Sequence, residues 1–264
     1  MENNRRDFLK IAGISALGLS SLSLLDVLST NKAVASSGQT EEAIYKNAAN
    51  AKTATRWGMI VNTRMLTEEI CKKMEAACHQ IHNVPYFAEK RHEIKWIWDT
   101  EYKHAFPDQP DEYLTERLQE LPIVVMCNHC ANPPCVRACP TQATFQRADG
   151  IVMMDFHRCI GCRFCMAACP YGSRSFNFRD PRPGIKEENP KFPTRMKGVV
   201  EKCNFCAERL AVGQLPACVE VSNGALVFGD LADPNSEVRI LLKENYAIRR
   251  KQILGTNPSV YYLV

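Results

Sequence analysis

Cysteine is the residue type in this chain that most clearly points to chemistry. The chain has 264 residues, of which 13 are cysteines, and all of them lie between Cys71 and Cys218. Such a density calls for a chemical role rather than a packing role. Closely spaced thiols can form disulfides, bind zinc or hold iron–sulfur clusters, so the spacing of the groups and the compartment of the protein must decide.

Two groups of four cysteines occupy the middle of the chain. The second has the spacing C-x2-C-x2-C-x3-C-P, in which three thiolates on a tight loop converge on one [4Fe–4S] cluster and the fourth ligates its neighbour. Proline fits after that fourth cysteine because the position needs no backbone donor. Zinc would need only two pairs of thiolates and gives no reason for the Cys-Pro ending. The groups are Cys127, Cys130, Cys135 and Cys139, then Cys159, Cys162, Cys165 and Cys169.

The crossover of the fourth cysteine in each group predicts two complete ligand sets. His129 lies inside the first loop, and we expect it to bond to the backbone rather than to metal. The first set is Cys127, Cys130, Cys135 and Cys169, and the second is Cys159, Cys162, Cys165 and Cys139.

Two further groups, one at each end of the cysteine-rich region, combine into a third set. The downstream group supplies three thiolates but has Ser222 where its crossover cysteine would stand. The upstream group supplies Cys78 at its crossover position. Each group lacks what the other provides, so the pair predicts one further [4Fe–4S] cluster. Its expected ligands are Cys203, Cys206, Cys218 and Cys78.

A fourth cluster is not expected, because both halves of its ligand set are missing. Its loop positions hold Glu68, Cys71 and Met74, and its crossover position holds Ser222. Three clusters therefore use twelve of the 13 cysteines, and Cys71 remains as a buried thiol. The alternative is a residual metal site with Glu68, Cys71 or Ser222 as unusual ligands.

The residues around Cys71 predict a helix in place of the lost loop. Thr67 can cap its start, and Glu68 and Glu69 suit the positive first turn. Pro85 lies beyond its end. The apolar face of this helix consists of Ile70, Met74, Ala77, Cys78 and Ile81.

Residues 1–35 predict an export signal of the twin-arginine class. The pair Arg5-Arg6 precedes a short apolar run at 11–25, and Ala33-Val34-Ala35 offers a cleavage site. Such export carries folded proteins, so clusters can be inserted before the membrane is crossed. We expect a periplasmic protein with no transmembrane segment in the mature chain, held at the membrane through partners. The alternative is an uncleaved anchor.

The cysteine groups, in this order, resemble the four-cluster ferredoxin subunits of membrane-bound polysulfide, dimethyl sulfoxide and nitrite reductase systems. The resemblance extends over the mature chain. It implies an α+β fold of tandem ferredoxin-like units of the bacterial 2[4Fe–4S] type. The expected parts are a central unit at 123–180, an outer unit at 56–84 and 195–230, an insertion at 85–122 and a C-terminal tail at 231–264.

Short strands are expected beside the cysteine loops, at 123–126, 151–154, 176–178 and 225–228. In the insertion, Trp96 and Trp98 alternate as strand residues do. This pattern predicts either inward packing of one indole or contact with a partner.

Clusters ligated fully by cysteine leave no position for a substrate, so we expect an electron-transfer subunit and not an enzyme. The resemblance implies a quinone-reactive integral membrane subunit and a periplasmic c-type cytochrome as partners, in a sulfur-metabolism complex. It also implies that the clusters are arranged in a line and that the missing cluster lies at one end of it. Positive charge at Arg137, Arg158, Arg163 and Lys202 should favour the reduced clusters.

Two other functions remain open. One is the electron-transfer subunit of a molybdopterin oxidoreductase, and the other is a secreted binding module stapled by disulfides. A nucleic-acid partner is not expected, because the formal net charge of +4 is small and the basic residues do not cluster.

Overall fold

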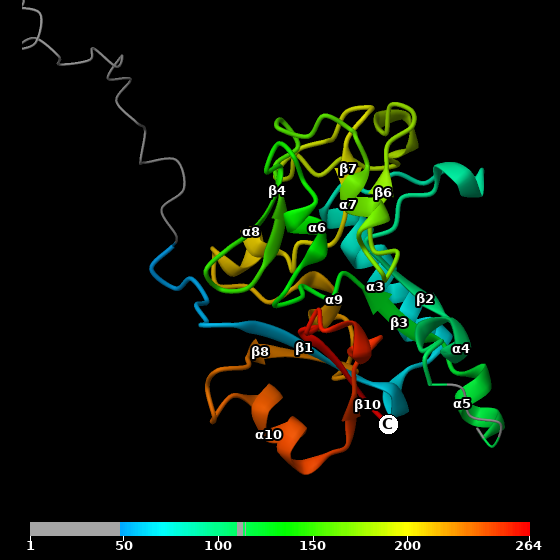
Figure 1. Ribbon diagram of the computed structural model, residues 1–264, viewed down its shortest axis with the longest axis vertical. Helices are drawn as coiled ribbons and strands as arrows, with labels where there is room; N and C mark the ends of the chain where they lie inside the picture. The colour runs from blue at the N-terminus through cyan, green and yellow to red at the C-terminus, as the bar shows by residue number, and fades with distance from the viewer. Residues whose placement is uncertain (1–47, 110–112, 114) are drawn as a thin grey trace, which may run out of the picture. The chain divides into compact units, whose positions relative to one another are not determined.

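The structure is a computed structural model that describes residues 48–109, 113 and 115–264 (Figure 1). The expected export signal at 1–35 lies outside the described residues. Within them, no helix combines the length and the apolar character needed to cross a membrane.

A four-stranded mixed sheet joins the two ends of the described chain. Strand β1 pairs antiparallel with β8 and parallel with β10, with Ile60 opposite Val227 and Tyr261. Met59 points to the main core, whereas Ile60 packs with Val238 on the other face, where Figure 1 shows α10. In sheet order the strands are β8 (Leu226–Asp230), β1 (Trp57–Asn62), β10 (Val260–Leu263) and β9 (Ala247–Ile248).

Residues 231–264, the expected C-terminal tail, contribute helix α10 and two strands of this sheet, β9 and β10. Helix α10 (Glu237–Glu244) packs on β8 and on β1, and β10 lies between β1 and β9. Val260 and Tyr262 are fully buried. Residues 260–263 were not predicted as a strand, because their partner β1 lies at the other end of the described chain.

Helix α3 (Glu68–Ile81) is the helix predicted around Cys71. The Thr67 hydroxyl accepts a hydrogen bond from the Ile70 N–H at 3.2 Å, so Thr67 caps the helix as expected. Cys71, Met74 and Cys78 are buried on its inner face. The amphipathic pattern therefore positions Cys78 toward the protein interior.

Three antiparallel strand pairs accompany the cysteine loops. The insertion contributes β2, which pairs with β3, so it is part of the core. The predicted strands at 123–126, 151–154, 176–178 and 225–228 correspond to β3, β5, β6 and β8, with shifts at their ends. The pairs are β2 (Ile97–Thr100) with β3 (Ile123–Met126), β4 (Thr144–Gln146) with β5 (Val152–Met154), and β6 (Ser175–Phe176) with β7 (Val200–Glu201).

Helices of a single turn accompany the cysteine loops. They are α6 (Pro134–Arg137), α7 (Phe164–Ala167), α8 (Ala207–Leu210) and α9 (Ala217–Glu220). Away from the cysteine loops lie α4 (Tyr102–Ala105), α5 (Glu116–Glu120) and the 3-10 turns Thr63–Met65, Lys90–His92, Arg182–Gly184 and Gln252–Leu254.

A buried polar network fixes the insertion to the body of the protein. The Trp96 indole N–H donates to Glu201 Oε2 at 3.0 Å, and Arg195 Nη2 pairs with the same oxygen at 2.6 Å. Asn177 donates to the other Glu201 oxygen. Trp96 is 1% exposed and Trp98 is partly buried. The expectation that one indole packs inward is therefore met by Trp96.

Candidate iron–sulfur centres

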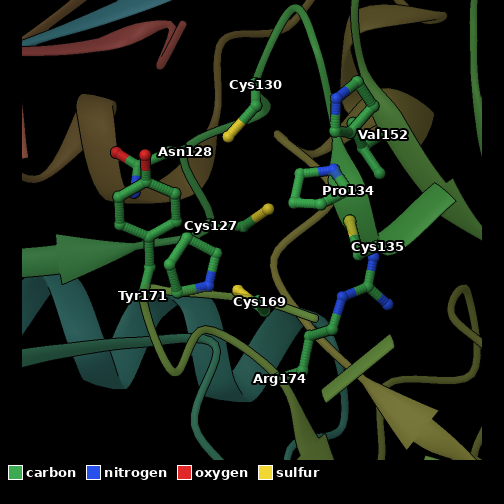
Figure 2. A pocket seen from close by; sticks show the side chains of 11 residues that line it. Cys127, Asn128, Cys130, Pro134, Cys135, Val152, Cys169, Tyr171 and Arg174 are labelled. Carbon is green, nitrogen blue, oxygen red and sulfur yellow. The ribbon is translucent and has the colours of Figure 1, made fainter. Parts of the chain in front are cut away.

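The central site gathers four thiols from both middle groups. Cys127, Cys130, Cys135 and Cys169 line one cavity, and Figure 2 shows their sulfur atoms directed toward a common space. Prolines and Val152 complete an apolar wall. The structure therefore brings Cys169 from the second group to the three thiols of the first, which is the crossover that the spacing predicts.

The remaining thiols of the two middle groups are the expected ligands of a second site, here called the surface site: Cys139, Cys159, Cys162 and Cys165. Burial raises the pKa of Cys165, and the charge of the neighbouring Cys159 raises it further. The backbone N–H of Thr144 donates to Cys139 Sγ at 3.4 Å, and its hydroxyl reaches Cys165. Cys139, Cys159 and Cys162 are partly exposed. Cys139 thus lies next to the loop with which the sequence pairs it.

The loop of the surface site depends on Gly161. Its φ is +72°, a conformation that side chains rarely adopt, and a Cβ there would lie 2.5 Å from the Gly198 carbonyl oxygen. The neighbouring Ile160 and Phe164 are 68% and 59% exposed. This loop therefore combines a tight turn with an apolar rim that faces solvent.

The inner site joins parts of the chain that are far apart in sequence. Cys78, at the end of α3, lies close enough to Cys206, Cys203 and Cys218 that their charges act on it. All four cysteines are buried. Cys206 has φ +51°, and the Phe205 N–H donates to Cys203 Sγ at 3.4 Å. A left-handed turn thus directs this pair of thiols inward.

The chemistry of these donors fits metal clusters. Burial raises the pKa of Cys78 well above its usual value, and the charges of Cys206, Cys203 and Cys218 raise it further. Burial and the Cys127 charge likewise raise the pKa of Cys130 to about 12. Four thiolates cannot be buried together without compensating positive charge, which iron supplies.

Disulfides do not explain these sites. All 13 cysteines lie in the part of the chain that the structure describes, and all are free thiols. At Cys139, burial acts to raise the pKa, but hydrogen bonds from the backbone N–H groups of Thr144, Thr141 and Ala143 and from the Thr141 hydroxyl bring it below its usual value. Donors directed at sulfur favour the thiolate form, which is the form that binds metal.

The central site is adjacent to each of the other two sites. Besides burial, the Cys127 charge raises the pKa of Cys203, so the central and inner sites are adjacent. In the same way Cys135 acts on Cys165, which joins the central and surface sites. The order is therefore inner, central, surface.

Ser222 and Cys71, the remnants of a fourth site, have other partners. The Ser222 hydroxyl donates to the Val219 carbonyl at 2.8 Å and accepts from the Leu226 N–H at 3.1 Å. The Cys71 thiol lies 3.8 Å from the Pro122 carbonyl. Burial, then the charge of Asp99, raises the pKa of Cys71 to about 12, so it is a neutral thiol.

The other two positions of that loop also lack a ligand role. Glu68 is exposed and pairs with Lys72 at 3.4 Å, which directs its carboxylate along the helix surface. Met74 is fully buried in the apolar core. The lost loop has become an ordinary helix, and the contacts of its residues disfavour the alternative of a residual metal site.

Two basic residues lie beside the sites, and only Lys202 was expected from the sequence. Lys202 is buried and donates to the Cys203 carbonyl at 2.8 Å. Arg174 is also buried, beside Cys135 (Figure 2). Arg174 is five residues from the nearest ligand in the chain, and no spacing rule places it near the sulfurs. By contrast, Arg158 lies next to a ligand but is exposed.

His129 bonds to the backbone, as its position in the loop suggested. Its Nδ1 accepts a hydrogen bond from the Val152 N–H at 3.0 Å, and its ring stacks on Phe205 at 3.7 Å. Burial, assisted by the charges of Lys202 and Arg174, lowers its pKa well below the usual value. The neutral ring joins the central loop to the loop of the inner site.

Comparison with known proteins agrees with this chemistry. Residues 121–181 match the 4Fe-4S dicluster domain family, and this segment contains the central and surface sites. It mixes short helices and short strands, so the chain contains a dicluster ferredoxin domain of mixed helix and strand content.

Relatives extend the match beyond that domain. The chain is 45% identical over 230 residues to the Hdr-like menaquinol oxidoreductase iron-sulfur subunit 1 of Archaeoglobus fulgidus, which covers 78% of this chain and 82% of the relative. It is 34% identical over 236 residues to the menaquinone reductase iron-sulfur cluster-binding subunit of Nitratidesulfovibrio vulgaris, covering 79% and 88%. It is also 34% identical over 209 residues to the protein NrfC of Escherichia coli, covering 78% and 79%. The chain therefore belongs to this family of iron–sulfur electron-transfer subunits.

Proposed function

We propose that the chain holds three [4Fe–4S] clusters and relays electrons along them. Two observations support this proposal: four thiols of the middle groups line one cavity, and Cys78 lies close to Cys203, Cys206 and Cys218. Twelve cysteines supply the ligands, and the contacts of Cys71 and Ser222 leave no set for a fourth cluster. Bound clusters supply one-electron transfer without a substrate position.

The protein's own residues hold and insulate these centres. An apolar wall lines the central site, and all four thiols of the inner site are buried. The surface site is different, because Cys159 and Cys162 are partly exposed beside Ile160 and Phe164. A partner's cofactor can approach most closely there, so this end of the row is the proposed point of electron exchange.

The missing fourth cluster belongs to the other end of the row. One remnant, Cys71, lies on the same helix as Cys78 of the inner site. The other, Ser222, follows the short helix that carries Cys218. A row that had lost an inner member would be interrupted, whereas a row shortened at its end still conducts. This arrangement agrees with two tandem ferredoxin-like units, of which only the outer one has lost a cluster.

The partners follow from the family. We infer a quinone-linked integral membrane subunit of the NrfD/DsrP type and a periplasmic c-type cytochrome, in a sulfur-metabolism respiratory complex. Two relatives are named for menaquinol oxidation and menaquinone reduction, which supports a quinone-linked partner. The twin-arginine pattern at Arg5-Arg6 supports a periplasmic location.

Within the family we propose that the chain corresponds to DsrO, the iron–sulfur subunit of a sulfite-reduction complex.

A molybdopterin oxidoreductase is the second candidate partner. The chain is 42% identical over 167 residues to a tetrathionate reductase subunit of Salmonella typhimurium, covering 60% of this chain and of the relative. Purification of the native complex distinguishes the two candidates. A co-purifying c-type haem subunit supports the cytochrome, and a molybdopterin subunit supports the alternative.

Iron and sulfide analysis of the anaerobically purified protein tests the cluster count, together with paramagnetic resonance of the reduced form. We expect about twelve irons and about twelve sulfides per chain, four for each cluster. About sixteen irons would contradict the absence of a fourth cluster. A colourless protein without iron would contradict the whole proposal.

A further inference from the structure

Arg174 lies outside the ligand sets, but sulfurs of two of these sets act on its guanidinium. It follows the turn after Cys169 and precedes β6, and its side chain is 5% exposed. Figure 2 shows its guanidinium beside Cys135 in the wall of the central site. The sulfurs that act on it are those of Cys135, Cys165 and Cys127, which belong to both the central and the surface site.

Only part of the guanidinium is satisfied by protein atoms. Nη1 donates to the Thr144 hydroxyl at 3.2 Å and lies 3.2 Å from the Met154 sulfur. Nη2 is buried and has no hydrogen-bond partner among the residues that the structure describes. A buried charged donor without a partner is costly, so a compensating group must lie next to it.

Arg195 provides a direct comparison within the same chain. It is equally buried, and it pairs with the Glu201 carboxylate at 2.6 Å. Arg174 forms no ion pair with a carboxylate in the described part of the chain, and its negative neighbours are the cysteine sulfurs. Burial acts to lower the pKa of Arg174, but those sulfurs together raise it above its usual value. Its counter-charge is therefore the pair of cysteine-ligated centres.

We propose that Arg174 is a positioning residue that acts as a shared counter-cation for the central and surface clusters and raises the reduction potential of both. This inference rests on the proposed function, because it requires clusters at these two sites. Reduction adds one electron, and hence one negative charge, to a site that already carries four thiolates. A fixed cation nearby stabilises that added charge, more strongly in a buried site than in water.

The shared position matters for the relay. A cation close to only one cluster would change the free-energy step between the two. Because Arg174 is next to sulfurs of both clusters, it raises both reduction potentials together. The free-energy difference for electron transfer between the two clusters therefore stays small. Arg174 thus supports transfer in the central part of the row without contacting a partner.

Potentiometric titration followed by paramagnetic resonance tests the proposal on the full cluster-loaded protein. Arg174→Gln and Arg174→Met remove the charge. We expect each to lower the reduction equilibrium constants of the central and surface clusters at least tenfold, which equals about 59 mV for one electron. Arg174→Lys keeps the charge and should recover most of the loss. The inner cluster, ligated by Cys78, should change less than about threefold and is the internal reference.

Arg158→Met is the matched control. Arg158 adjoins the ligand Cys159, but its side chain is 66% exposed and pairs with Asp155 at 3.3 Å. Solvent screening should limit its effect to less than about threefold. Equal shifts for the Arg158 and Arg174 variants, or equal shifts of all three clusters, would overturn the special role of Arg174.

Iron content separates the possible failures. If Arg174→Met loses iron, the test is made with Arg174→Gln and Arg174→Lys. Variants that hold about twelve irons with unchanged potentials overturn this inference and leave the proposed function intact. A wild-type protein that holds far fewer than about twelve irons overturns the proposed function itself.

Discussion

His82 Nε2 lies 2.8 Å from Glu208 Oε1, and this contact joins the end of α3 to α8. His82 Nδ1 also lies 2.9 Å from the Cys78 carbonyl oxygen, and Asn204 donates to the second oxygen of Glu208 at 2.8 Å. Nitrogen, sulfur and oxygen atoms of His82, Cys206 and Glu208 lie within 4.8 Å of one another. The contact explains how two distant segments are held together at the inner site.

Replacing Cys78 tests the third ligand set. Cys78→Ser should lower the iron content from about twelve to about eight per chain, because one cluster loses a ligand while the other two keep theirs. Iron analysis and resonance spectra measure the result. Cys71→Ser is the matched control on the same helix and should keep about twelve irons. An unchanged count in Cys78→Ser, or a loss of four irons in Cys71→Ser, would reverse the assignment.

The Arg195–Glu201 pair should be important for stability. Both side chains are fully buried, so removal of one leaves an uncompensated charge. Glu201→Ala should lower the free energy of unfolding by about 3–5 kcal/mol. Urea unfolding under anaerobic conditions measures this. Glu201→Gln, which can still accept from the Trp96 indole, should cost less. A loss below about 1 kcal/mol for Glu201→Ala would show that the network contributes little.

Asp230 should make stability depend on pH. Burial acts to raise its pKa, but backbone N–H groups of Ala232, Thr55 and Arg56 donate to the carboxylate and bring the pKa below its usual 3.8. A group with a lowered folded-state pKa stabilises the protein above the unfolded-state pKa and loses this effect as the pH falls through the folded-state value.

Asp230→Asn should therefore be less stable at pH 7 by about 1 kcal/mol, given the partial exposure of the carboxylate. The difference between the two proteins should shrink as the pH falls below 3.8. Urea midpoints of the two proteins, measured at pH 7 and below pH 3.8, test this. The two proteins are compared at each pH because acid damages their clusters equally. A difference that grows toward low pH would contradict the expectation.

The apolar rim of the surface site should be needed for electron exchange. Phe164→Glu places a charge on a side chain that is 59% exposed beside the partly exposed thiols. We expect unchanged iron content but at least tenfold slower reduction or oxidation by the membrane partner, measured by stopped-flow absorbance. Tyr246→Glu alters another exposed aromatic residue, which is 75% exposed next to β9, and is the control. Equal rates for both variants would show that exchange occurs elsewhere.

The sequence determined the chemistry of this protein because cluster ligation depends on local spacing. The C-x2-C-x2-C-x3-C-P run predicts both the cofactor and the crossover, and the structure does place Cys169 with the loop of Cys127. The helix around Cys71 was equally predictable, since its cap and its apolar face are properties of consecutive residues.

Only the tertiary structure decided what depends on long-range contact. Strand β10 could not be predicted, because four residues become a strand only by pairing with β1 at the other end of the described chain. The order of the three sites and the position of Arg174 between two of them have the same origin. Arg158 is close to a ligand in sequence, but it is exposed and solvent screens its charge. Arg174 acts on the cluster sites because folding buries it beside their sulfurs.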